Sequence, residues 1–121
     1  MQPEKRDFSS LWDIIKAAKL IQTFIEEKGK EEFEQDPMCH FAVIAQIQII
    51  GEATKRLSRD FRAIHSSIPW KEIAGMRDIL IHLYDCVDLD EVWHVVTKDL
   101  PELIAYIEPL LPPEPTEESV S

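Results

Sequence analysis

Apolar side chains recur at helical intervals along most of the chain. In the first segment they follow the i, i+3, i+4, i+7 spacing that gathers side chains on one face of an α-helix. These residues are Leu11, Ile14, Ile15, Ala18, Ile21 and Ile25. With Ser10 and Asp13 as a capping box and Gly29 as the C-cap, the pattern predicts a helix over residues 9–28.

A second helix is predicted over residues 37–59. Asp36 followed by Pro37 is a typical helix start, because the missing N–H of proline is not needed in the first turn. The first half of this segment is apolar nearly all round, which is typical of a central helix or of one shared between the core and a partner chain. Gly51 within it indicates a close approach to another helix.

Three shorter helices are predicted in the second half of the chain. Ser66 or Ser67 is expected to cap a third helix that has Pro69 in its first turn. Asp88 and Glu91 form a capping-box pattern for a fourth helix, which runs to about Lys98. The proline at 101 is expected to break or kink the chain before a last helix over residues 101–111.

These patterns predict an all-α protein, an up-and-down bundle of four to five helices. Alternating strand patterns and hairpin dipeptides are missing, and the sequence has three glycines. The length of 121 residues fits a single domain, expected over residues 1–111. The acidic, proline-rich segment 112–121 is expected to be a disordered tail.

The formal net charge of −10 argues against a broad nucleic-acid-binding surface but leaves room for a small basic site. Cys39 and Cys86 form no CxxC pair, which is typical of a reduced cytosolic protein. No apolar run approaches membrane-spanning length. We therefore expect a cytoplasmic protein without a membrane segment and without a cofactor, whose modest size favours burial of an apolar helix face in an oligomer.

The stretch GMRDILIHLYDCVDL, residues 75–89, concentrates candidate chemistry in a mostly apolar helix. On a helix Arg77 and Tyr84 lie within about 20° of each other, and Asp78 and His82 within about 40°. An arginine matches phosphate oxygens, and a histidine exchanges protons near neutral pH. This set suits metal-independent phosphodiester cleavage, with His82 taking a proton from a ribose 2′-hydroxyl and Arg77 stabilising charge on the phosphate.

Arg77 and His82 are about 140° apart on a straight helix, which separates the two groups. A kink, or a second copy of the helix across a dimer axis, would bring them closer. The spacing therefore favours a homodimer with its site at the subunit interface.

Arg77, His82 and Tyr84 form an R-X4-H-X-Y pattern, which resembles the motif of HepT-like proteins of the HEPN superfamily. The blocks IIGEATKRLS at 49–58, PWKEIAGMRD at 69–78 and VDLDEVWHVV after them agree with this family, and the resemblance covers residues 9–107. It implies a HEPN-like helical homodimer that acts as the ribonuclease toxin of a prokaryotic toxin–antitoxin pair. The motif residues have Arg77 and His82 in the catalytic positions and Asp78 and Tyr84 in supporting ones.

The resemblance also implies a partner and a modification. The antitoxin of such a pair is a minimal nucleotidyltransferase that adenylylates the motif tyrosine, here Tyr84. The position after the motif arginine is often asparagine in the family and is Asp78 here.

A basic cluster surrounds the predicted end of the second helix, and two interpretations of it are equally supported. Its members can be cations placed favourably at a helix C-terminus, or they can form a track for the RNA backbone that leads to the site. They are Lys55, Arg56, Arg59 and Arg62.

Two other functions remain open from the sequence. One is a non-catalytic helical subunit that binds a minimal nucleotidyltransferase through the apolar face of the second helix, and the other is a nucleotide-binding module.

We expect no bound metal. The neighbours Cys39 and His40 lack the spacing of a metal site, and so do Cys86 and His82. We therefore assign the two thiols to packing.

Overall fold

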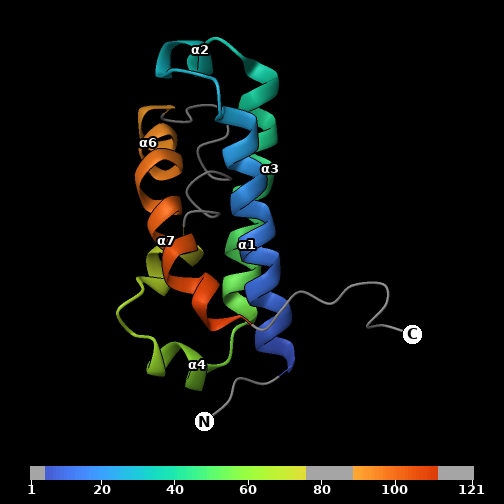
Figure 1. Ribbon diagram of the computed structural model, residues 1–121, viewed down its shortest axis with the longest axis vertical. Coiled ribbons are helices and arrows are strands. Elements are labelled where there is room, and N and C mark those ends of the chain that lie inside the picture. The colour runs from blue at the N-terminus through green and yellow to red at the C-terminus, as the bar shows by residue number, and fades with distance from the viewer. Residues whose placement is uncertain (1–4, 76–88, 112–121) are drawn as a thin grey trace, which may run out of the picture.

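The computed structural model describes residues 5–75 and 89–111, and these residues form helices and turns without a strand. Two long helices, α1 (Lys5–Ile25) and α3 (Pro37–Arg56), lie antiparallel and side by side (Figure 1). The last helical stretch lies beside α1 and consists of α6 (Leu89–His94), η1 (Val95–Asp99) and α7 (Leu100–Ile107). The predicted all-α, up-and-down bundle is confirmed.

The core lies between α1, α3 and α7. The apolar face predicted for the first helix is buried almost completely, and it packs mainly against α3. Fully buried residues of α3 and α7 complete this core, which is the expected result of joining apolar helix faces. The fully buried contributors include Leu11, Ile14, Ile21, Val43, Ile47, Ile50, Leu100 and Ile107.

Helix α1 starts earlier than the sequence pattern indicated. Ser10 lies inside the helix and is buried, so the predicted capping box of Ser10 and Asp13 is wrong. Asp7 lies in the first turn instead, and its carboxylate accepts hydrogen bonds from Ser58. A contact between residues so far apart in sequence stabilises a turn that local patterning cannot identify.

The connection between α1 and α3 contains an additional short helix, α2 (Lys30–Glu34). Helix α1 ends at Ile25, and Gly29 is the N-cap of α2, so its predicted role as the C-cap of the first helix is wrong. Phe33 is the buried residue of α2. Its ring lies against those of His40 and Trp93, with centroids 4.9 and 5.2 Å away, so tertiary packing stabilises this turn.

Helix α3 begins as predicted and ends earlier than predicted. The Asp36 side chain accepts a hydrogen bond from the backbone N–H of Cys39, and Pro37 occupies the first turn. The helix ends at Arg56, because Leu57 is extended and Ser58 begins a separate helix, α4 (Arg59–Ile64). The Ser58 hydroxyl accepts from the N–H of Phe61 and caps α4.

The next helical segment occupies residues 70–75 of the described chain. Pro69 accepts the hydrogen bond of Ile73 N–H, so it precedes the first turn. The predicted cap, Ser66 or Ser67, is wrong, because both residues lie in the turn before Pro69. The Ser67 hydroxyl instead donates to the Tyr106 hydroxyl at 2.9 Å. The predicted cap Asp88 and the expected tail 112–121 lie outside the described residues.

The proline at 101 does not break the chain. Residues Val95–Asp99 form a π-helical turn in which the N–H of Leu100 donates to the carbonyl of Val95, and α7 follows directly. Pro101 then lies in the first turn of α7, where its missing N–H is tolerated. The short 3₁₀ turn η2 (Glu108–Leu110) ends this stretch.

Among the described helices, none is long and apolar enough to cross a membrane.

Candidate functional site

The R-X4-H-X-Y motif lies in the segment between Gly75 and Leu89. Arg77, Asp78, His82 and Tyr84 are therefore outside the described residues, and so is Cys86. The described chain reaches within two positions of Arg77, where it forms part of a basic hollow.

The basic hollow is an open depression of about 770 Å³ formed by α3, α4 and the helical segment 70–75. Four of its described lining residues carry a positive charge and none carries a negative one. The lining consists of Lys55, Arg59, Arg62, Ala63, Trp70, Lys71, Ala74 and Gly75. This gathers positive charge at one place in a chain whose net charge is −10.

The local sequence explains why α4 presents its two arginines to the hollow. Arg59 and Arg62 are three residues apart, so they share a face of the short helix. Phe61 lies on another face and is buried in the core. With Ser58 capping the helix and Phe61 anchoring it, Arg59 and Arg62 are held where they line the hollow.

The turn after α4 folds back and brings Lys71 to the other side of the hollow. The indole N–H of Trp70 donates to the carbonyl of His65 at 2.9 Å, and the Trp70 ring lies 6.0 Å from that of Phe61. These contacts bury Trp70 and fix the first turn of the segment 70–75. Lys71, the next residue, lines the hollow as a consequence.

Arg62, which lines the hollow, has an additional feature. Its Nε atom is buried and has no hydrogen-bond partner within the described structure. A buried N–H without an acceptor costs free energy unless a ligand or water supplies one. Phosphate oxygens are the acceptors that the guanidinium fork matches best.

The hollow brings together three of the four residues of the predicted basic cluster. Lys55, Arg59 and Arg62 line it, whereas Arg56 does not. Arg56 instead forms an ion pair with Asp13 of α1, with Nη2 2.9 Å from Oδ2. Lys71 was not among the predicted residues, because only the turn between α4 and residue 70 brings it near the cluster.

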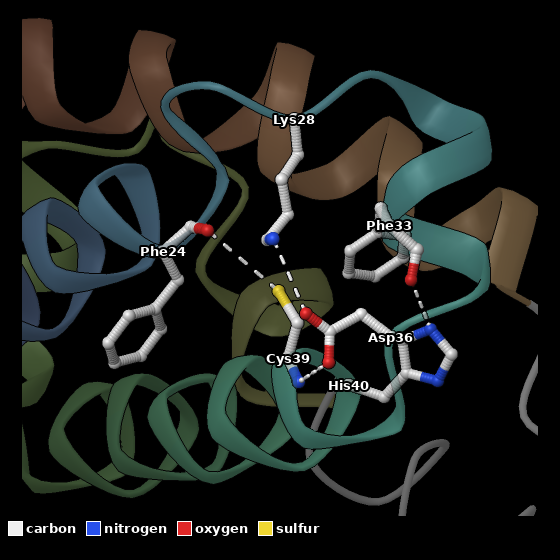
Figure 2. A network of polar contacts seen from close by, with 6 residues as sticks. All are labelled: Phe24, Lys28, Phe33, Asp36, Cys39 and His40. Carbon is white, nitrogen blue, oxygen red and sulfur yellow. Dashed lines mark hydrogen bonds and ion pairs between the residues drawn. The ribbon is translucent and has the colours of Figure 1, made fainter.

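Cys39 and His40 belong to a structural network at the corner between α1, α2 and α3 (Figure 2). The Cys39 thiol lies 3.9 Å from the Phe24 carbonyl oxygen, and the Nε2–H of His40 donates to the Phe33 carbonyl. Burial, with the Asp36 carboxylate as a smaller cause, raises the pKa of the Cys39 thiol. A thiol that remains protonated is a poor metal ligand and a poor nucleophile.

Asp36 connects this corner to the loop that follows α1. Its carboxylate accepts from the backbone N–H of Cys39 at 3.2 Å and lies 3.3 Å from the ammonium of Lys28. The hydrogen bond from Cys39 and then the contact with Lys28 lower the pKa of Asp36. Within residues 5–75 and 89–111, no group of three or more histidine, cysteine or acidic side chains is arranged to hold a metal ion.

Comparison with known proteins identifies the family of this chain. A family model described as ribonuclease HepT-like matches residues 14–110. A probable ribonuclease HepT from Thermococcus cleftensis is 43% identical over 110 residues, which cover 91% of this chain and 98% of that protein. A candidate RNase from Caldanaerobacter subterraneus subsp. tengcongensis is 45% identical over 84 residues, 69% of this chain and 75% of that protein.

A third relative is a longer protein. A Methanocaldococcus jannaschii protein, named both a gamma-glutamylcyclotransferase and a candidate RNase, is 46% identical over 90 residues. The match covers 74% of this chain and 40% of that protein. No solved protein structure gives a significant match. With a family model covering most of its length, the chain belongs to the HepT-like ribonuclease family.

Proposed function

We propose that this chain is a metal-independent endoribonuclease and the toxin of a prokaryotic toxin–antitoxin pair. Residues 1–111 act as one domain in the cytoplasm, as a homodimer that pairs two R-X4-H-X-Y motifs at its interface. Family membership supports ribonuclease activity, because the family model and the relatives carry that activity in their names. The basic hollow is the structural observation that carries the proposal.

The position of the hollow relative to the motif supports RNA binding. Gly75 lines the hollow and precedes Arg77 by two positions, so RNA bound there lies near the start of the motif. Lys55, Arg59, Arg62 and Lys71 neutralise backbone phosphates of the incoming strand. A local cationic surface of this kind is needed because the rest of an acidic chain repels RNA.

In the proposed reaction, His82 removes the proton from a ribose 2′-hydroxyl, and the freed oxygen attacks the adjacent phosphorus. The bond to the 5′-oxygen of the next nucleotide breaks and that oxygen takes up a proton. The products are a 2′,3′-cyclic phosphate and a 5′-hydroxyl end. Arg77 stabilises the charge that builds on the phosphate oxygens, while Asp78 and Tyr84 position these groups.

The test is RNA cleavage by the purified full chain in the presence of a chelator. Removing a general acid–base group or a phosphate-stabilising group slows such reactions by about 100-fold or more. Arg77→Ala and His82→Ala should therefore lose cleavage at least to this extent, and the wild type should leave cyclic phosphate ends. Equal cleavage by all three proteins would refute the assigned roles.

The proposed regulation is covalent. A minimal nucleotidyltransferase antitoxin transfers AMP from ATP to Tyr84: the phenolic oxygen attacks the α-phosphorus, pyrophosphate leaves, and the phenol loses its proton. The bulky, charged group would then block the motif. Mass spectrometry after incubation with the antitoxin and ATP should find one AMP group on Tyr84 and none on a Tyr84→Phe variant.

A second candidate function is supported by the exposed apolar face of α3. Met38 is 82% exposed and Phe41 62% exposed, and Ile49 continues the same face. A non-catalytic helical subunit would use this surface to bind a minimal nucleotidyltransferase. Complex formation without any RNA turnover by the wild type would favour this function over the nuclease.

A further inference from the structure

A second cavity lies on the other side of the helical segment 70–75. It is a groove of about 600 Å³ between residues 67–75 and the continuous stretch formed by α6, η1 and α7. Lys71 faces the basic hollow, whereas its neighbours Glu72 and Ile73 line this groove. The two cavities meet at Gly75, which lines both. We call the second cavity the acidic groove.

The floor of the acidic groove is apolar. Ile68 and Ile73 contribute from one side, and Leu100 and Leu103 from the other. The groove leaves parts of these buried side chains accessible from outside, and the partly exposed ring of Tyr106 lies at its edge. An apolar floor of this kind favours a ligand that supplies apolar side chains of its own.

The rim of the groove is negatively charged on both sides. Its four carboxylates are Glu72 from the segment 70–75, Glu91 from α6, Asp99 from η1 and Glu102 from α7. The described lining contains no lysine, arginine or histidine. Within the part of the chain that the structure describes, neither Glu72 nor Glu102 forms an ion pair.

The π-helical turn shapes the helical wall of this groove. Glu91, Val95 and Asp99 follow one another at intervals of four along the wall, and Glu102 and Tyr106 continue it in α7. His94 and Asp99 are five residues apart, and Nε2 of His94 lies 3.9 Å from Oδ1 of Asp99. In a regular α-helix two residues at this separation point in directions about 140° apart. The wide turn therefore redirects side chains here, and such turns are frequent at functional sites.

We infer that the acidic groove binds a short amphipathic helix of a partner protein that combines apolar side chains with lysine or arginine. The apolar residues would cover the floor while the cations pair with the rim carboxylates. RNA is excluded as the occupant because its phosphates would face the carboxylates. This inference is independent of the nuclease activity.

A second copy of this chain does not fit the groove. A two-fold contact through this surface would place one acidic rim against an identical acidic rim. The basic hollow of another copy is also concave, so it offers no protruding surface that could fill the groove. Charge and shape together therefore favour a different protein, whose docking helix is basic.

The test uses a fluorescein-labelled helical peptide of leucine and lysine, with the apolar residues on one face, and fluorescence anisotropy on the full chain. The double variant E72Q/E102Q removes two rim charges. The control E31Q/E32Q removes two exposed charges from α2, so its net charge equals that of the rim variant. The rim variant should bind the peptide about tenfold more weakly than the wild type, and the control should bind like the wild type.

Two results would overturn the inference. Equal weakening in both double variants would mean that the peptide responds to overall charge and not to the groove. Equal binding of a lysine peptide that has serine in place of leucine would mean that the apolar floor takes no part. Circular dichroism of each variant separates a lost groove from a lost fold.

Discussion

The carboxylate of Asp7 accepts two hydrogen bonds from Ser58, one from its backbone N–H and one from its hydroxyl, each at 2.7 Å. Asp7 lies in the first turn of α1 and is only 1% exposed, while Ser58 lies at the junction of α3 and α4. The same hydroxyl accepts from Phe61 N–H and caps α4. The pair therefore connects the start of the chain to the helix that carries Arg59 and Arg62.

Replacing Asp7 with alanine should destabilise the protein. It leaves the backbone N–H of Ser58 without its acceptor in a partly buried place, which costs about 1–3 kcal/mol. Urea unfolding of Asp7→Ala should show this loss. The control Asp13→Ala removes an exposed ion pair with Arg56 and should cost no more than about 1 kcal/mol. Similar losses in both variants would contradict the structural role of Asp7.

The loss of RNA affinity on removing a cation should depend on whether that cation lines the basic hollow. Arg59→Ala and Lys71→Ala each remove one cation from it and should weaken binding of single-stranded RNA about fivefold. Each should also reduce the slope of log K against log salt by about 0.7. Arg56→Ala is the matched control, because Arg56 pairs with Asp13 outside the hollow and its loss should leave affinity nearly unchanged.

This comparison separates the two interpretations of the basic cluster. Cations that only stabilise helix ends would leave the salt dependence of RNA binding the same in every variant. Equal losses for Arg56→Ala and Lys71→Ala would instead indicate a response to net charge alone.

The exposed apolar face of α3 predicts self-association. Met38→Glu combined with Phe41→Glu places two charges on this face, and neither side chain belongs to the core. If the homodimer buries the face, the double variant should be monomeric in size-exclusion chromatography with light scattering, with its helix content unchanged. Leu20→Glu, on the exposed side of α1, is the control and should remain dimeric. A double variant that stays dimeric would show that the homodimer does not bury this face.

Stability should fall in acid partly through Asp36. Its pKa in the folded protein lies below the ordinary value of 3.8, owing to the N–H of Cys39 and the ammonium of Lys28. A lowered pKa means that the contribution is fully present above the unfolded value and is lost as the pH falls through the folded value. The melting temperatures of wild type and Asp36→Asn should therefore differ at pH 7 and converge below about pH 4. A constant difference across this range would exclude the charge as its cause.

Local patterning identified the long helices because their stability depends on periodic apolar faces. The buried face of α1 and the start of α3 at Asp36 and Pro37 needed no knowledge of the remaining chain. The errors occur where a distant residue supplies the decisive contact. Asp7 extends α1 at one end through Ser58, and Phe33 stabilises α2 through His40 and Trp93.

The sequence by itself determined the helical class, the family and the motif, since each depends on residue types at short, regular separations. Only the tertiary structure decided which cations share a surface: Lys71 joins Arg59 and Arg62, and Arg56 pairs with Asp13. It also placed basic and acidic cavities on the two sides of one short segment. The reason is physical, because the direction of a chain after a turn is set by packing contacts such as that of Trp70 with Phe61, and not by helical period.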